Sequence, residues 1–173
     1  MNLLEYFDSN PDVTWSVLDK PPAWVMVQGV PASWRETVMK SVTGNPGPVW
    51  VDLDAAAAGA HGEAGSLFSS QATVVGWELR SVHASLLELV TMAAGMTEDV
   101  PGWAVRSTER TRPAAGVVSL YMCGTLESPY GQLVSNIQNV GVGQPGRPMT
   151  LVQLAVTATQ QWTDVADEIR LAL

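Results

Sequence analysis

The residues that could do chemistry are few, and they are scattered along this sequence. The two histidines, His61 and His83, lie far apart and away from cysteines or paired carboxylates at the spacing of metal ligands. Asp52 and Asp54 form an acidic pair after an apolar run. A divalent cation would need further oxygen ligands, so a turn is the favoured interpretation. We therefore expect no metal and no cofactor.

A nucleophile is not indicated either. Cys123 is the single cysteine, and it lies in an apolar run typical of a strand. A buried, unreactive thiol is the usual outcome there, and no internal disulfide can form. The sequence has no G-x-S-x-G elbow, and "GVGQPG" reads as a turn between two strands, not as a phosphate-binding loop. We expect no catalytic residues and no enzymatic activity, with a hydrolase as the remote alternative.

The charge of the chain limits the classes of partner. Nine Lys and Arg residues stand against seventeen Asp and Glu residues, for a net charge of −8. Such a balance argues against sequence-independent binding of nucleic acid. Arg106, Arg110 and Arg112 form a basic cluster in "RSTERTR". An anion site is one interpretation of it, but a solvated strand edge is favoured, because charges there discourage edge-to-edge pairing.

The tryptophans are the nearest approach to a binding site. Of the seven tryptophans, those at 77, 103 and 162 fit apolar faces and are predicted to be core. Trp24, Trp34 and Trp50 lie in the first third of the chain, near loops. Large amphipathic rings are favoured in interfaces and ligand grooves. These three residues are therefore the candidate binding surface.

The first half of the chain is rich in strands and prolines. Residues 13–19 and 23–30, separated by "KPP", predict a β-hairpin. Ser33 with Glu36 matches a capping box and predicts a short helix in "PASWRETVMKSV". A brief strand is expected over residues 49–53. The Gly/Ala-rich segment that follows, "AAAAGAHGEAG", is expected to be a mobile loop.

The second half predicts a strand, a helix, four strands and a closing helix. The first strand falls within residues 66–80, and Ser81 is expected to cap the helix "VHASLLELVTMAAGM". Four strand-like runs with short connections follow, which implies antiparallel pairing. The closing helix is expected from Thr159 onward, with Asp164, Asp167 and Arg170 on its solvent-exposed face. The order predicts an α+β fold, an antiparallel sheet of about six strands flanked by helices, in a single sandwich domain over residues 1–173.

Short motifs in residues 67–173 resemble the actinobacterial LpqN-type family, within the PsbP-like α/β/α sandwich superfamily. They are "FSSQATVVGWEL", "SLLELVTMAAGM", "VPGWAVRSTERT", "AAGVVSLYMCGTLES" and "TLVQLAVTATQQWTDVADEI". The resemblance implies the same fold and a role in binding partners, often in cell-envelope processes, and it supplies no catalytic residues. The chain departs from the lipoprotein members of the family because it shows no lipobox cysteine.

These observations support three functional hypotheses. The leading one is a non-enzymatic protein-binding module, an adaptor or accessory protein of a secretion or cell-envelope system, as the resemblance to DcrB-like adaptors also suggests. The alternative is a small-molecule or lipid-binding protein with an apolar groove between sheet and helix. The third is a hydrolase. No apolar run reaches the length of a membrane span, and "MNLLEYFDSNPD" does not read as a signal peptide, so we expect a cytoplasmic protein.

Overall fold

The computed structural model describes residues 1–39, 47–52 and 70–173. His61, Asp54 and the Gly/Ala-rich segment predicted to be mobile lie outside the described residues. The elements in chain order are α1 Leu3–Ser9, β1 Thr14–Val17, β2 Val27–Gln28, β3 Trp34–Met39, β4 Gly47–Asp52, β5 Gln71–Arg80, α3 Leu86–Glu98, β6 Trp103–Ala114, β7 Val117–Ser128, β8 Gly131–Val142, β9 Met149–Ala158, the 3₁₀ turn η1 Gln160–Trp162, α4 Thr163–Glu168 and β10 Arg170–Leu171.

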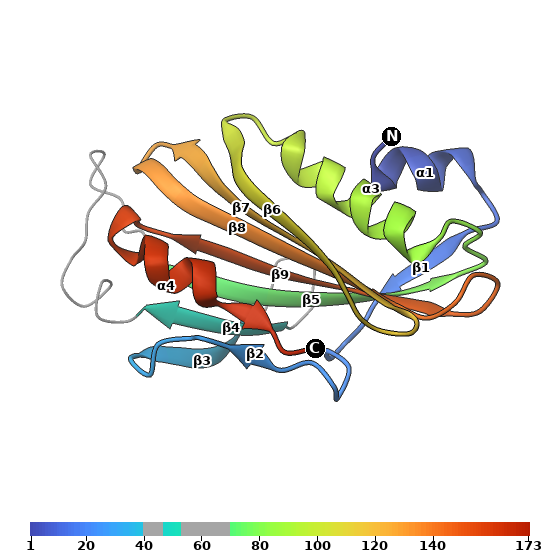
Figure 1. Ribbon diagram of the computed structural model, residues 1–173, viewed down its shortest axis with the longest axis horizontal. Coiled ribbons are helices and arrows are strands. Elements are labelled where there is room, and N and C mark those ends of the chain that lie inside the picture. Colours follow the sequence, from blue (N-terminus) through green and yellow to red (C-terminus); the bar gives the residue numbers. More distant parts are fainter. Residues whose placement is uncertain (40–46, 53–69) are drawn as a thin grey trace.

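Most of the described strands form one antiparallel sheet. Within the described residues this sheet has eight strands, in the order β3-β4-β5-β9-β8-β7-β6, with β1 paired to β5. The strands β2 and β10 form a separate two-stranded pair. The predicted α+β class, an antiparallel sheet flanked by helices, is confirmed (Figure 1). The sheet has about two strands more than expected, and β3, predicted as a helix, is one of them.

The four consecutive strands predicted for the second half are confirmed. They form a meander from β6 to β9, and β7 pairs with β8 without a break, from Val117 opposite Val142 to Ser128 opposite Gly131. The first strand of this half, β5, pairs antiparallel with β9 at its far side. Nearest-neighbour pairing of short-linked strands is the usual solution, so the sequence order is enough to predict this part.

Two predictions in the first half are wrong. The segment predicted as a helix capped by Ser33 is strand β3, which pairs with β4 from Trp34 opposite Asp52 to Met39 opposite Gly47. The expected hairpin is absent from the described residues, because β1 pairs with β5 and β2 pairs with β10. The strand β3 pairs with the next strand in the chain, whereas β1 and β2 pair with strands far away in the sequence. In each case the pairing with another strand supplies backbone hydrogen bonds and overrides the local pattern.

The long helix begins four residues later than predicted. Ser85, not Ser81, is the N-cap: its side chain accepts a hydrogen bond from the backbone of Glu88, and Glu88 bonds back to the backbone of Ser85. The hydrogen bonds that the Glu88 carboxylate accepts from the backbone and the hydroxyl of Ser85 lower its pKa. Ser81 instead adopts a left-handed conformation with φ of 61°, which turns the chain from β5 toward the helix.

The closing helix is shorter than predicted. Thr159 is extended and makes no capping hydrogen bond, and its buried hydroxyl has no partner among the described residues. The 3₁₀ turn η1 and the six-residue helix α4 follow, and the chain then becomes extended in β10. Asp164 lies in the first turn of α4 as predicted. Arg170 instead lies in β10, where it pairs with Gln28 of β2.

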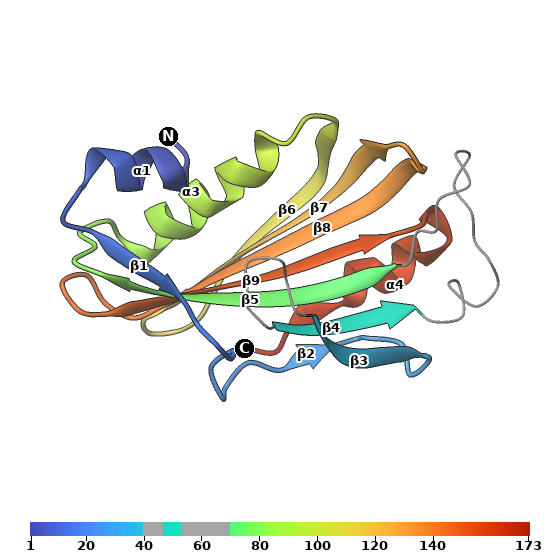
Figure 2. The same ribbon diagram turned by 180° about the vertical axis from the view of Figure 1, so that it is seen from behind.

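Apolar layers cover both faces of the sheet. On one face, Leu89 and Val90 of α3 pack with Met122 and Leu151 of the sheet, and α1 joins them through Leu3. On the other face, Ala166 and Ile169 of the C-terminal segment pack against a second cluster that includes Val152. Figures 1 and 2 show α1 and α3 next to each other, with α4 apart from them. The molecule is therefore a three-layer α/β/α sandwich.

The first prediction concerns Gly124 on β7. A Cβ atom on this residue would lie 2.5 Å from the ring of Trp103, and the indole of Trp103 also donates a hydrogen bond to the carbonyl of Ser135. Because a rigid ring cannot yield at little cost, Gly124→Ala should lower the free energy of unfolding by about 1–3 kcal/mol.

The control is Gly95→Ala on α3. Its Cβ would make ordinary contacts of 3.7 Å with Asn2, so this variant should keep or raise stability, by up to about 1 kcal/mol. Urea unfolding of the two variants measures both effects. Equal stabilities would contradict the packing of Trp103 on Gly124.

Candidate functional site

The structure separates the three tryptophans of the predicted binding surface. Trp24 is 41% exposed, whereas Trp34 is only 4% exposed. Trp50 lies on β4, where its neighbours across the sheet are Glu36 and Ala72. Trp34 therefore cannot belong to an open surface, which corrects that part of the prediction. A binding role for Trp24 stays a prediction.

Trp34 is part of the core beneath the C-terminal segment. Its ring meets the ring of Trp162 edge to face, with a distance of 5.7 Å between centroids. Its indole Nε1 is buried and has no hydrogen-bond partner among the described residues. Trp162, Trp77 and Trp103 are half-buried against the two apolar clusters, in agreement with the core role expected for them.

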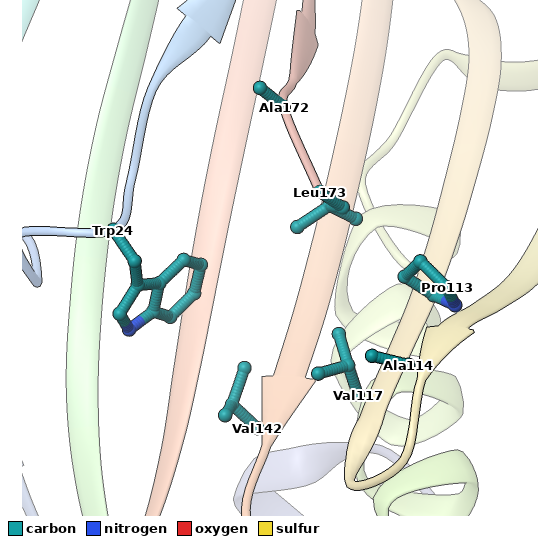
Figure 3. A pocket seen from close by; sticks show the side chains of 7 residues that line it. All are labelled: Trp24, Pro113, Ala114, Val117, Val142, Ala172 and Leu173. Carbon is teal, nitrogen blue, oxygen red and sulfur yellow. The ribbon is translucent and has the colours of Figure 1, made fainter.

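Trp24 lines an apolar hollow of about 300 Å³, which we call the Trp24 hollow. Figure 3 shows Trp24 facing Pro113 and Ala114 across it, with Leu173 between them. Two of the lining residues, Trp24 and Leu173, are large apolar side chains that remain exposed, at 41% and 50%. The remaining lining residues are Val117, Val142 and Ala172.

A second hollow, the α1 hollow, lies between the sheet and the helices. It has a volume of about 200 Å³. Three of its lining residues are large and exposed and form its rim: Leu4 at 53%, Trp15 at 49% and Met96 at 36%. Its other lining residues are Leu3 and Phe7 of α1, Ala93 of α3, Trp77 and Leu79 of β5, and Leu151 and Gln153 of β9. An apolar hollow between sheet and helix is the site that the lipid-binding hypothesis requires.

The lining of the α1 hollow has aromatic and polar features. The ring of Phe7 stacks on Trp15 with centroids 5.8 Å apart. Gln153 supplies an amide, whose Nε2 donates a hydrogen bond of 2.9 Å to Oδ1 of Asn139. Nδ2 of Asn139 is buried and has no partner among the described residues. Buried donors without a partner are uncommon in folded proteins. The amide pair is therefore an unusual polar feature beside an otherwise apolar lining.

Sequence reasoning missed this hollow because it missed α1. The signal was present: Asn2 and Glu5 form a capping box, in which each side chain bonds to the backbone of the other residue. The apolar residues Leu3, Leu4 and Phe7 follow at helical spacing. The burial of Leu3 and the partial burial of Phe7 in the cluster under α3 depend on the tertiary structure.

A polar network lies on the other face, under α4. Arg106 of β6 makes a two-armed ion pair with Asp167 of α4, and the shorter arm is 2.7 Å. Asn136 of β8 is fully buried and donates a 2.8 Å hydrogen bond to the same carboxylate. Burial acts to raise the pKa of Asp167, but the hydrogen bonds from Arg106 and Asn136 outweigh it and lower the pKa.

The network continues to the end of the chain. The hydroxyl of Tyr121 donates to the carbonyls of Ala166 and Asp167, and burial raises its pKa. Arg170 stacks over the ring of Tyr121 at 4.2 Å and pairs with Glu109 of β6 at 2.6 Å. These contacts hold the C-terminal segment on the sheet, and we call the network the anchor.

Other candidates from the sequence are not brought together. Cys123 is free and buried, as predicted. Arg106 points into the network, whereas Arg110 and Arg112 remain exposed on β6, which is an edge strand as the favoured interpretation required. Over residues 1–39, 47–52 and 70–173, no three His, Cys, Asp or Glu side chains gather as metal ligands.

Comparisons with known proteins bear on the fold. No family model matches the sequence, and no curated protein matches it. The structure superimposes on the crystal structure of LpqN, a protein involved in cell envelope biogenesis of Mycobacterium tuberculosis, with a TM-score of 0.68 over 99% of this chain and 96% of that chain. The fold is that of LpqN. The sequence identity is 14%, so membership of the LpqN-type family and of the PsbP-like superfamily stays a prediction.

The likeness in fold covers 99% of this chain, whereas the sequence motifs lie within residues 67–173. None of the described helices is long and apolar enough to cross a membrane.

The second prediction concerns the anchor. Asp167→Asn should lower the free energy of unfolding by about 1–3 kcal/mol at about pH 7, because Arg106 loses its charged acceptor. The folded-state pKa of Asp167 is lowered from 3.8. The ionised carboxylate therefore stabilises the fold above that value, and this contribution is lost as the pH falls through the folded-state pKa.

The difference between wild type and Asp167→Asn should accordingly shrink as the pH falls below 3.8 and through the folded-state pKa of Asp167, as measured by urea unfolding. The matched control is Glu109→Gln, which removes the partner of an exposed ion pair; Glu109 is 54% exposed, and its loss should cost less than about 1 kcal/mol. An effect of Asp167→Asn that does not change with pH would contradict the assigned charge state.

Proposed function

We propose that this protein is a non-enzymatic binding module that serves as an accessory protein in a cell-envelope or secretion process. The LpqN-like fold supports the accessory role, because LpqN is described as involved in cell envelope biogenesis. The structural use of Arg106, Asp167 and Tyr121 supports a role without catalysis, since these polar groups anchor the C-terminal segment. The cytoplasmic location is also a proposal, and it rests on the sequence alone.

The ligand that the geometry favours is a small apolar molecule or the end of an acyl chain. The observation that carries this proposal is the α1 hollow, where Leu4, Trp15 and Met96 stay exposed around an apolar interior. Each methylene that leaves water contributes about 0.8 kcal/mol. A ligand that also covers the rim side chains removes more apolar surface from water. An acyl chain that fills the hollow and crosses its rim would therefore bind.

The size of the α1 hollow restricts the ligand. Its volume of about 200 Å³ is smaller than the roughly 300–1,000 Å³ of most sites for drug-sized ligands. A bulky ring system would therefore not fit. A single unbranched alkyl chain is the matching shape, and its polar end would remain outside the rim.

The third prediction tests this ligand class with dodecanoate. Binding should shift the tryptophan emission, because Trp15 and Trp77 line the hollow. Ala93→Leu adds bulk inside the hollow and should weaken binding about tenfold or more, by excluding about two methylenes. The matched control is Ala172→Leu, which adds the same bulk to the Trp24 hollow and should leave binding unchanged.

Thermal unfolding of both variants shows whether the added bulk disturbs the fold itself. If saturating dodecanoate produces no emission shift in the wild type, or if the two variants weaken binding equally, the α1 hollow is not the ligand site.

The second candidate function is the binding of a protein, and the Trp24 hollow favours it. Trp24 and Leu173 expose apolar surface in the lining of this hollow. Tryptophan is enriched in protein interfaces, and a tryptophan beside a pocket is a common centre of binding energy. This surface is separate from the α1 hollow, so the two functions can be tested independently.

The fourth prediction tests the Trp24 hollow. The wild-type protein, crosslinked mildly in lysate of its native host and isolated through a tag, should capture a partner that Trp24→Ser does not capture. Mass spectrometry measures the difference. Trp15→Ser, which changes a tryptophan of similar exposure at the α1 hollow, serves as the control. Capture that is the same with both variants would exclude the Trp24 hollow as the docking surface.

A further inference from the structure

The strand β6 is an open edge of the large sheet. It is twelve residues long, and every residue from Ala104 to Ala114 is exposed. Within the described residues it pairs with β7 and with no other strand. The outer side of such an edge presents backbone N–H and C=O groups that are available to another chain.

The middle of β6 is regular enough to accept a further strand. The pairing with β7 is irregular between Val105 and Ser107 and again between Thr111 and Ala114. Between these points, residues 107–111 pair in continuous register with residues 119–123. Bulges protect an edge strand against pairing with another chain. In β6 the irregularities lie at the two ends, so residues 107–111 between them lack this protection.

The charges on this stretch differ between its two sides. Thr108 and Arg110 are opposite Met122 and Leu120, which belong to the cluster under α3. Arg110 therefore lies on the α3 face, and Glu109 lies on the other face, where Arg170 pairs with it. No carboxylate of the described residues forms an ion pair with Arg110 or Arg112, although the chain has a net charge of −8.

We propose that β6 binds an extended acidic segment of a partner protein as an added edge strand. Carboxylates at alternate positions of that segment would lie on one face of the new strand. One of them would stand opposite Arg110, and the next would be within reach of Arg112. The backbone supplies affinity and the two arginines supply selectivity, as in other strand-addition complexes.

A second copy of this chain fits the edge less well. Opposite residues of an antiparallel pair share a face, so Glu109 of one copy cannot stand opposite Arg110 of the other. A pair centred on either residue would place like charges opposite each other, which is destabilising. Two copies also carry −8 each, and their mutual repulsion disfavours association.

This inference rests on the proposed protein-binding role and names the chemistry of the partner. The probe is a short synthetic peptide that alternates threonine and glutamate, and its counterpart alternates threonine and lysine. Fluorescence anisotropy measures binding, and backbone hydrogen exchange locates it. The glutamate peptide should bind and slow exchange in residues 107–111, and the lysine peptide should not bind.

The deciding variant is Arg110→Glu combined with Arg112→Glu. It should weaken binding of the glutamate peptide about tenfold or more, because like charges then meet across the edge. The control is Arg35→Glu, which reverses one arginine charge, half of the change in the deciding variant, on β3, the strand at the opposite edge. It should leave the affinity for the peptide unchanged.

Three outcomes would overturn the proposal: no binding of the glutamate peptide, equal binding by both variants, or protection outside β6. Slowed exchange in β6 that depends on protein concentration and not on peptide would assign the edge to a second copy and also overturn it. If the partner captured through the Trp24 hollow persists while β6 stays unprotected, the protein-binding role stands and only this inference fails.

Discussion

The ion pair between Arg106 and Asp167 is the contact on which the architecture depends most. It joins the edge strand β6 to α4, and Asn136 in the centre of the sheet bonds to the same carboxylate. A helix of six residues is too short to be stable alone, so these polar contacts set its place. That place in turn brings β10 to β2, and the C-terminal segment holds part of the N-terminal third on the sheet.

The two hollows follow from a difference in length between strands and helices. A strand of twelve residues, such as β7, spans about 40 Å. The thirteen-residue helix α3 spans about 20 Å. Neither α3 nor the C-terminal segment can cover its face of the sheet from end to end. Beyond the ends of these helical segments, only loops and α1 pack against the apolar residues of the strands. This packing is incomplete, and a hollow remains on each face of the sheet.

The candidate site was predictable only in part. Exposure of Trp24 agrees with its position near a proline turn, but the burial of Trp34 depends on β3 lying beside β4 and under Trp162. The composition of the α1 hollow could not be predicted, because its lining comes from α1, β1, β5, α3 and β9. Side chains from five separate segments meet there, and no local pattern records such a meeting.

By itself the sequence determined the elements whose partners are close in the chain: the meander β6–β9, whose strands are joined by short turns, and the helix α3, whose apolar residues repeat at helical spacing. Hydrogen bonds and apolar contacts between near neighbours cost little loop entropy, so local pattern is enough to specify them. The tertiary structure alone decided the places of β1 and β2, the early end of α4 and the anchoring role of Asp167. Each of these depends on a partner far away in the chain, and the energy of that distant pairing exceeds the local preferences that the sequence displays.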